Sequence, residues 1–228
     1  MTVAAVILAA SPASALADAD GTPGARRIAN AAWAGGATPV VVCAHDPEGD
    51  VAKVLATAEV TLVDPVAPEL GPVGQIVNGI EAAASLVAET DAALVWPARM
   101  AWVDAETVTS LIAAHGLDRR SVLRPAFGGA PGWPVLVPMT HLATFRTLSP
   151  TRMPGELFDD LAGAGVPFTT LETGDPGVTH DVSTPRADLP PYDGPPQPAD
   201  AHDHEWGLAT ADEPDDAAVE GPGRLSGR

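Results

Sequence analysis

The 228-residue chain has little cysteine, lysine or aromatic content and no long apolar run. It contains one cysteine, Cys43, and one lysine, Lys53, and aromatic residues make up 4% of it. A single cysteine excludes an internal disulfide and a thiolate metal cluster. No apolar run reaches the roughly 20 residues that a membrane-spanning helix needs. These absences predict a soluble protein of a reducing compartment, and we expect it in the cytoplasm.

Positive charge is also scarce. Twelve basic residues face 30 acidic ones, which gives a formal net charge of −18 at pH 7. A chain this acidic has no general attraction to phosphate backbones or anionic lipid, so we expect no nucleic-acid partner and no membrane partner. The hydrophobic fraction of 46% is large enough for a core, although small residues dominate it.

The first 18 residues allow two interpretations. An apolar stretch followed by small residues resembles a secretory signal peptide, but no Lys or Arg precedes Arg26, so the positively charged n-region is missing. The alternative is a buried first β-strand over residues 3–8, which would open a parallel sheet.

The composition changes after residue 188. Residues 189–228 hold seven prolines, five glycines and nine acids against two arginines. Such a segment cannot bury enough apolar surface to offset its ordering entropy, so we expect a disordered acidic tail that follows a folded domain over residues 1–188. The run His202-Asp203-His204-Glu205 has metal-ligating residue types, but a solvated polar run explains it better without a rigid scaffold.

Within residues 1–188, strand-like and helix-like segments alternate. Short apolar runs rich in β-branched residues predict strands at 3–8, 40–43, 60–63, 92–96, 121–126, 135–137, 168–171 and 178–182. Helical periodicity is found at 28–34, 51–58, 76–88 and 105–114, with Asp104 placed as the N-cap of the last helix. This alternation predicts a three-layer α/β domain, with helices on both faces of a mostly parallel sheet. Ligands of such sheets bind beyond the carboxyl ends of the strands.

Several blocks, taken in order, resemble the MobA-like nucleotidyltransferases, the cytidylyl- and guanylyltransferases of the molybdenum cofactor. The blocks are Leu8-Ala9-Ala10, Gly21-Thr22-Pro23, Leu94-Val95-Trp96-Pro97 with Asp104-Ala105-Glu106-Thr107-Val108, Arg124-Pro125-Ala126-Phe127-Gly128-Gly129, Gly132-Trp133-Pro134-Val135-Leu136, Asp175-Pro176-Gly177-Val178 and Asp181-Val182-Ser183-Thr184-Pro185. The resemblance covers residues 3 to about 188. It implies a Rossmann-like sheet of the nucleotide-diphospho-sugar transferase type, and it makes residues 3–8 a strand.

The resemblance also implies where ligands would bind. A nucleoside triphosphate with Mg²⁺ would occupy a cleft lined by Leu8, Ala9, Ala10, Ser11, Gly74, Gly79, Pro97 and Arg99. The acceptor, a molybdopterin-type compound in the family, would lie near Gly129, Gly132 and Trp133. For Gly74 and Gly79, a glycine turn that opens a helix is an equally adequate explanation.

The phosphate-binding positions depart from the family pattern. The family has a glycine-rich loop, G-x-S-x-R-M-G, whose backbone amides and cations surround the triphosphate. Residues 11–20 of this chain contain no Gly, Lys or Arg, Pro12 lacks an amide donor, and Asp18 and Asp20 would repel phosphate. Arg26 and Arg27 follow in the next helix, where a role on the helix surface is the favoured interpretation.

The metal-binding positions depart as well. Arg99 replaces the family Asp that holds magnesium, and Ser183 replaces a second Asp near the metal, while Asp181 is retained and Asp91 is expected at the far end of its strand. A guanidinium cannot ligate a cation. Arg99 could contact phosphoryl oxygens, or it could pair with Asp104 or another acid. We therefore assign no catalytic residue and no metal site, and we expect no cofactor.

Four further residues, three tryptophans and the cysteine, lie near the expected cleft. Trp133 could stack on a flat ligand or simply pack. Trp96 and Trp102 flank Arg99 and are expected to make the rim of the cleft apolar. Cys43 has no neighbouring base and is expected to fill the core rather than act as a nucleophile.

Three functional hypotheses remain. The first is a working nucleotidyltransferase; the second is a non-catalytic relative that uses the old cleft or the acidic tail to bind a ligand or a protein partner. The third, a secreted acidic protein, is disfavoured by the resemblance. Because function depends on the site rather than on the fold, we favour a nucleotidyltransferase-fold protein whose transferase activity is weakened or lost.

Overall fold

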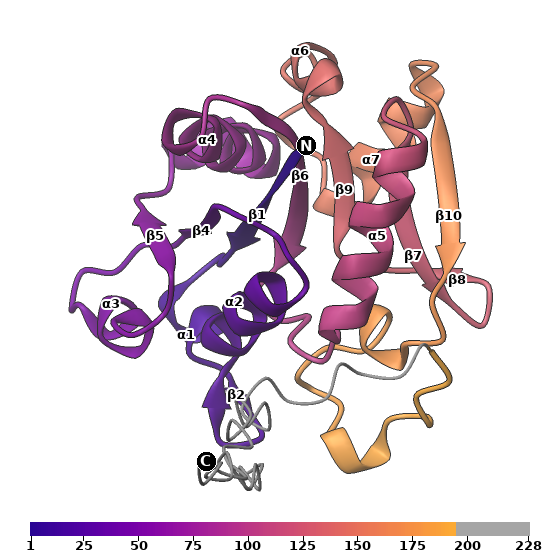
Figure 1. Cartoon of the computed structure of the whole chain (residues 1–228). Helices are drawn as coiled ribbons and strands as arrows, with labels where there is room; N and C mark the ends of the chain where they lie inside the picture. The colour runs from indigo at the N-terminus through magenta and orange to yellow at the C-terminus, as the bar shows by residue number, and fades with distance from the viewer. Residues whose placement is uncertain (195–228) are drawn as a thin grey trace, which may run out of the picture. The chain divides into compact units, whose positions relative to one another are not determined.

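The computed structural model describes residues 1–194 (Figure 1). Its strands are β1 (Thr2–Leu8), β2 (Asp18–Ala19), β3 (Thr22–Pro23), β4 (Val40–Cys43), β5 (Val60–Val63), β6 (Thr90–Pro97), β7 (Val122–Phe127), β8 (Ala130–Pro131), β9 (Val135–Pro138) and β10 (Phe168–Glu172). Its α-helices are α1 (Pro12–Ala15), α2 (Gly24–Ala34), α3 (Asp50–Leu55), α4 (Gly71–Leu86), α5 (Ala105–Leu117), α6 (Leu142–Phe145) and α7 (Pro154–Gly163). None of the described helices has the length and apolar character that crossing a membrane requires.

The central sheet has the order β10-β7-β9-β6-β1-β4-β5, and β8 pairs with β7. β9 runs antiparallel to its neighbours β6 and β7, whereas the other neighbouring strands along this path pair in parallel. The predicted architecture is therefore confirmed: the domain has a Rossmann-like, mostly parallel sheet.

Each face of the sheet carries its own apolar core, because successive residues of a strand point to opposite faces. In β1, Ala5 and Ile7 pack with Ile28 of α2 and Leu111 of α5. Ala4 and Val6 of the same strand pack with helices of the other face, and the buried helical residues there include Ile76, Ile80, Phe145 and Phe158. Helices α2, α3 and α5 thus cover one face, and α4, α6 and α7 cover the other (Figure 1).

A glycine sets the distance between α4 and the sheet. A Cβ atom added to Gly79 would lie 2.3 Å from Val6 Cγ1 and 2.9 Å from Cys43 Sγ. Neither distance leaves room for a methyl group, so only glycine lets the middle of α4 lie this close to β1 and β4. Cys43 is only 2% exposed, and burial raises the pKa of its thiol to about 12, which confirms that it fills the core.

The strand predicted at 178–182 is wrong. Pro176–Val178 form a 3₁₀ turn, in which the Asp175 side chain caps the Gly177 amide, and the following residues continue as a loop. The sequence prediction also missed α7 and the short helix α1. By contrast, Asp104 occupies the N-cap position of α5, as predicted, although its side chain makes no capping hydrogen bond there.

After β10, residues 173–194 return along the carboxyl edge of the sheet, as the orange-to-yellow segment in the lower part of Figure 1. We call residues 173–194 the return segment. Val178 O accepts a hydrogen bond of 2.9 Å from Trp133 N, and Val182 N donates one of 2.9 Å to Arg99 O. Near the end of the segment, Asp193 N donates to Gly174 O at 2.9 Å. The rest of the expected acidic tail, including His202 to Glu205, lies outside the described residues.

Candidate functional site at the carboxyl edge

The carboxyl ends of β1, β4 and β6 meet at the middle of the sheet. Leu8, the last residue of β1, is in register with Cys43 on one side and with Pro97 on the other. Ala9 N donates to Cys43 O at 3.0 Å, and Ala98 N donates to Leu8 O at 2.9 Å. The backbone beyond the three strands is therefore held in place where ligands of parallel sheets bind.

A cavity of about 250 Å³ opens at this point, and we call it the cleft cavity. Its lining residues are Leu8, Ala9, Ala10, Cys43, Pro72, Gln75, Pro97, Met153 and Pro154. Four of the predicted cleft residues, Leu8, Ala9, Ala10 and Pro97, thus come together. Met153 and Pro154 were missed because α7 was not predicted, although Pro154 followed two residues later by Glu156 is typical of a helix start.

Gly74 and Gly79, also predicted for the cleft, have structural roles on α4. Gly79 faces Val6 and Cys43, as described above, and a Cβ atom on Gly74 would lie 2.5 Å from Leu70 Cβ. Gly74 lines a different cavity of about 330 Å³, which also borders Leu148 and Pro150. Their lack of side chains thus serves close packing of α4.

Ser11 begins the segment that replaces the glycine-rich loop. Its Oγ accepts a hydrogen bond of 3.2 Å from Ser14 N, and Ser14 Oγ accepts one of 3.1 Å from Ser11 N. These reciprocal bonds cap the four-residue helix α1. Asp18 Oδ1 accepts from Gly21 N at 3.1 Å in the following turn. Backbone amides at this position are therefore engaged by the chain's own side chains.

Arg99 and Ser183, the residues for which the sequence resemblance implies metal positions, both contact Asp181. Arg99 Nε and Nη2 each lie 2.9 Å from Asp181 Oδ2. The backbone amide and the hydroxyl of Ser183 both donate to Asp181 Oδ1. Partial burial alone would raise the pKa of Asp181, but the hydrogen bonds from Ser183 and the Arg99 guanidinium outweigh it and lower that pKa.

These residues do not fit a divalent cation. The position would offer a single carboxylate, and both of its oxygens already accept hydrogen bonds from Arg99 or Ser183. A guanidinium cannot act as a ligand, and it repels a cation. Asp91 lies at the opposite end of β6, as predicted, where it accepts from Thr2 N at 2.8 Å. No group of three His, Cys, Asp or Glu residues within residues 1–194 is placed to hold a metal ion.

The arginines of α2 are used for packing. Arg26 NH1 donates to Val54 O at 3.1 Å and to Thr57 Oγ1 at 2.8 Å. Arg27 Nε donates to Ala101 O at 3.0 Å, and its guanidinium lies 5.2 Å from the centre of the Trp102 ring. The interpretation that these cations serve the helix surface is consistent with these contacts.

The expected apolar rim formed by Trp96 and Trp102 is wrong, because both side chains are buried. Trp96 is fully buried and Trp102 is 5% exposed. Trp96 Nε1 donates to Met100 O at 2.9 Å. Trp102 Nε1 lies 3.0 Å from both Asp181 O and Thr184 O, so the return segment covers it.

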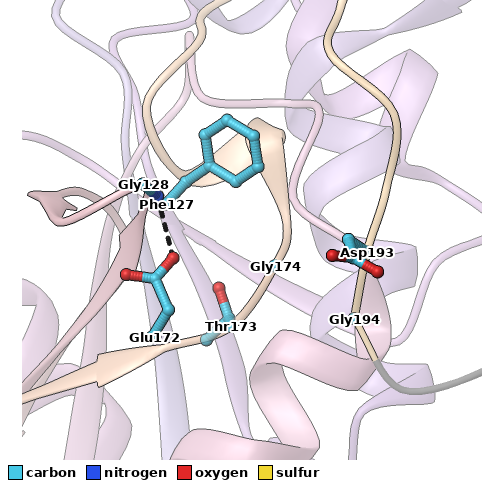
Figure 2. Close-up of a pocket in the computed structure, with 7 residues that line it drawn as sticks. All are labelled: Phe127, Gly128, Glu172, Thr173, Gly174, Asp193 and Gly194. Atoms are coloured by element: carbon cyan, nitrogen blue, oxygen red, sulfur yellow. Dashed lines mark hydrogen bonds between the residues drawn. The ribbon is translucent and has the colours of Figure 1, made fainter.

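The predicted acceptor side contains a glycine turn that holds a carboxylate of the same chain. Gly128 N donates to Glu172 Oε1 at 2.8 Å, and Gly129 N donates to Glu172 Oε2 at 3.0 Å. Figure 2 shows Glu172 beside this turn, with Phe127 above it and Asp193 across the opening. These residues border a surface cavity of about 460 Å³. The positive φ angles of both glycines aim the two amides at one acceptor.

Gly132 and Trp133 also have structural roles on this side. A Cβ atom on Gly132 would lie 2.0 Å from Val178 O, so the return segment requires glycine there. The Trp133 ring packs edge to face on Phe158, with 5.5 Å between the ring centres. For Trp133, the contacts therefore support packing rather than stacking on a ligand.

A buried carboxylate that the sequence analysis missed joins the return segment to α5. Asp175 is 1% exposed and accepts hydrogen bonds from Asp104 N at 2.9 Å, Thr107 Oγ1 at 2.7 Å and Gly177 N at 2.8 Å. Burial raises the pKa of Asp175 despite these bonds. The sequence signal was the D-P-G turn, in which an Asp commonly caps the backbone two residues on.

The family model described as the MobA-like NTP transferase domain matches residues 5–164. No curated protein matches the chain. Among solved structures, a nucleotidyl transferase from Methanothermobacter thermautotroptrophicus is 18% identical, with a TM-score of 0.62, over 75% of this chain and 87% of that one.

Two further similar solved structures are complexes with a ligand. Rv0371C from Mycobacterium tuberculosis H37Rv, complexed with manganese, is 13% identical with a TM-score of 0.60, over 76% of this chain and 89% of that one. The CMP:2-keto-3-deoxy-manno-octonic acid synthetase complexed with CTP is 15% identical with a TM-score of 0.55, over 76% of this chain and 90% of that one. At these identities the likeness establishes the fold alone.

Proposed function

Since the chain belongs to the MobA-like NTP transferase domain family, we propose that it keeps the fold as a ligand-binding protein whose metal-dependent nucleotidyl transfer is weakened or lost. The observation that carries this proposal is the ion pair between Arg99 and Asp181, with an Nε to Oδ2 distance of 2.9 Å, at the family's metal position. The pair occupies the place where the resemblance puts a magnesium carboxylate.

The chemistry of the reaction explains why this substitution matters. Nucleotidyl transfer builds negative charge on the phosphoryl oxygens and on the leaving pyrophosphate, and a divalent ion that bridges these oxygens stabilises the transition state. Asp181 already neutralises the charge of the Arg99 guanidinium, and its carboxylate would repel a phosphate that approached the pair. Near the first strand, the Ser11–Ser14 capping bonds use the amides that a phosphate would need.

A working nucleotidyltransferase is the second candidate. It is favoured by the family model over residues 5–164 and by the similarity to a structure that holds manganese and to another that holds CTP. On that hypothesis the cleft would take a nucleoside triphosphate, and a phosphorylated acceptor such as a molybdopterin-type compound would lie near Gly129.

A thermal-shift titration with each nucleoside triphosphate, repeated in the presence of MgCl₂, MnCl₂ or EDTA, separates the two candidates. A ligand that binds only the folded state must raise the midpoint by mass action. We expect no metal-dependent shift, and no pyrophosphate release when a phosphorylated acceptor is added. Arg99→Asp alone is also expected to release no pyrophosphate, because the phosphate loop is still missing. A metal-dependent shift with pyrophosphate release from the wild-type chain would favour the working enzyme.

A further inference from the structure

The cleft cavity lies where the sheet presents its ligand site, but its chemistry is unlike that of a triphosphate site. None of its nine lining residues is charged, and most of the lining side chains are apolar. Pro72 and Gln75 come from α4, Met153 and Pro154 from the start of α7, and the remaining residues from the ends of β1, β4 and β6. The cavity is thus built from both the sheet and the helices of one face.

The polar side chain of the lining is already engaged. Gln75 Oε1 accepts from Val66 N at 3.2 Å, and Gln75 Nε2 donates to Val66 O at 3.0 Å. Cys43, the other lining side chain with a hydrogen-bonding atom, is buried, and its raised pKa of about 12 keeps the thiol protonated near neutral pH. A ligand would therefore gain little from a charged group in this cavity.

A ligand of this cavity could be an anion, a cation or an uncharged molecule, and the lining is unfavourable for the first two. An anion would find no cationic side chain in the lining, within a chain whose formal net charge is −18. A cation would lose its hydration without a carboxylate in the lining to replace it, which is unfavourable. An uncharged apolar molecule would lose no hydration of a charge, and burial of its apolar surface would favour binding.

We propose that the cleft cavity binds a small, uncharged, largely apolar ring compound in place of a nucleotide. This inference rests on the proposed binding function and names the ligand class. The volume of about 250 Å³ lies below the range of drug-sized pockets and suits one or two fused rings. Met153 is 64% exposed at the rim, and its unbranched side chain can adapt to the outline of a ligand.

Methionine methyl groups provide a direct test. The chain has four methionines, of which Met153 alone lines the cavity. In protein labelled with ¹³C at the methionine methyls, with the Met153 signal assigned by Met153→Leu, titration with indole is expected to shift that signal saturably and to leave those of Met1, Met100 and Met139 in place. Indole-3-carboxylate, which has the same ring with a negative charge, is expected to bind at least about tenfold more weakly.

A pair of matched variants locates the site. Ala10 lines the cavity and is exposed, so Ala10→Phe would place a ring in the opening without entering the core. Ala56, also exposed, lies just beyond α3, outside the lining, and Ala56→Phe adds the same ring there. We expect Ala10→Phe to weaken indole binding at least about tenfold and Ala56→Phe to leave it unchanged, with both variants folded by circular dichroism.

The outcomes separate this inference from the function on which it rests. It is overturned if indole leaves Met153 unshifted, if indole-3-carboxylate binds as tightly, or if Ala10→Phe and Ala56→Phe behave alike. CTP with MgCl₂ and a phosphorylated acceptor that shifts Met153 without pyrophosphate release would overturn the inference but leave the loss of catalysis standing. The same mixture that shifts Met153 and releases pyrophosphate would overturn both.

Discussion

The guanidinium of Arg99 and the carboxylate of Asp181 lie 2.9 Å apart, although 82 residues separate them in the sequence. The pair joins the loop after β6 to the return segment, and the Val182 N to Arg99 O hydrogen bond of 2.9 Å adds a backbone link at the same place. Of the two roles considered for Arg99, contact with phosphate or pairing with an acid, the structure supports pairing, and Asp181 is an ion-pair partner.

Arg99→Gln should raise the pKa of Asp181, because it removes the positive charge that helps to lower it. A carboxyl group with a lowered folded-state pKa adds stability above its unfolded pKa of about 3.9, and this stability is lost as the pH falls through the folded value. With Arg99 54% exposed, we expect a loss of about 0.2–1 kcal/mol in unfolding free energy at pH 7 and a smaller loss at pH 3, where the unfolded carboxyl group is already largely protonated.

A carboxyl ¹³C titration of Asp181 and urea unfolding at the two pH values check this. The control is Arg119→Gln, which removes a longer ion pair, that between Arg119 and Asp91 at 3.7 Å. An Asp181 pKa unchanged in Arg99→Gln would contradict the prediction.

Gly79→Ala should destabilise the domain, because its Cβ would meet Val6 Cγ1 at 2.3 Å and force α4 away from the sheet. Overpacking of this kind costs about 1–3 kcal/mol. Gly163→Ala is the matched control, because a Cβ there has no atom within 4 Å, and alanine favours a helix over glycine by up to about 1 kcal/mol. Gly79→Ala should therefore lower the urea unfolding midpoint, and Gly163→Ala should raise it. Equal shifts in the two variants would count against the close approach at Gly79.

His115 should make stability fall as the pH is lowered through the unfolded-state value of about 6.5. Its side chain is 1% exposed, neither ring nitrogen has a partner within residues 1–194, and burial lowers its pKa despite the nearby carboxylates of Asp91 and Asp118. The unfolded chain then binds the proton more readily, which reduces the unfolding free energy by up to about 1.4 kcal/mol per pH unit below that value.

His115→Leu should flatten this dependence between pH 7 and pH 5, measured by urea unfolding at each pH. His45→Gln, which changes an exposed histidine, should leave it as in the wild type. A pH dependence that persists in His115→Leu would show that other groups cause it.

Glu172→Ala should expose the amides of the glycine turn to solvent. These amides donate to the Glu172 carboxylate at 2.8 and 3.0 Å. Loss of a bond worth about 1 kcal/mol should speed amide exchange at Gly128 and Gly129 about fivefold. Exchange measured by NMR should be unaffected by Glu89→Ala, an exposed acid elsewhere. Exchange at the same rate in Glu172→Ala would mean that the carboxylate does not protect the turn.

Much of the fold could be predicted from local patterns. The apolar runs that became β1, β4 and β6 are buried in the middle of the sheet, and such strands give a clear signal because both of their faces are covered. The antiparallel direction of β9 could not be predicted, because an antiparallel strand with four buried residues has the same apolar pattern as a buried parallel strand. The strand expected at 178–182 failed because Asp175 and distant backbone groups fix that segment as a turn.

The site could be predicted only where strand ends define it. Leu8 and Pro97 are neighbours in register, so the position of the strands was enough to place both at one cavity. Met153 reaches the same cavity from a helix start nearly sixty residues further along the chain, which no local pattern could place there. Trp102 was misjudged for the same reason, because the carbonyl groups that accept from its indole belong to Asp181 and Thr184.

The stretch that the family model matches ends at residue 164, before β10 and the return segment. A fragment that ends at residue 164 would lack β10, the parallel neighbour of β7, and it would expose the Trp102 indole to water. The unpaired edge of β7 would then be available to pair with strands of other copies of the fragment. Anyone excising this domain for crystallography or fusion should therefore cut no earlier than Gly194.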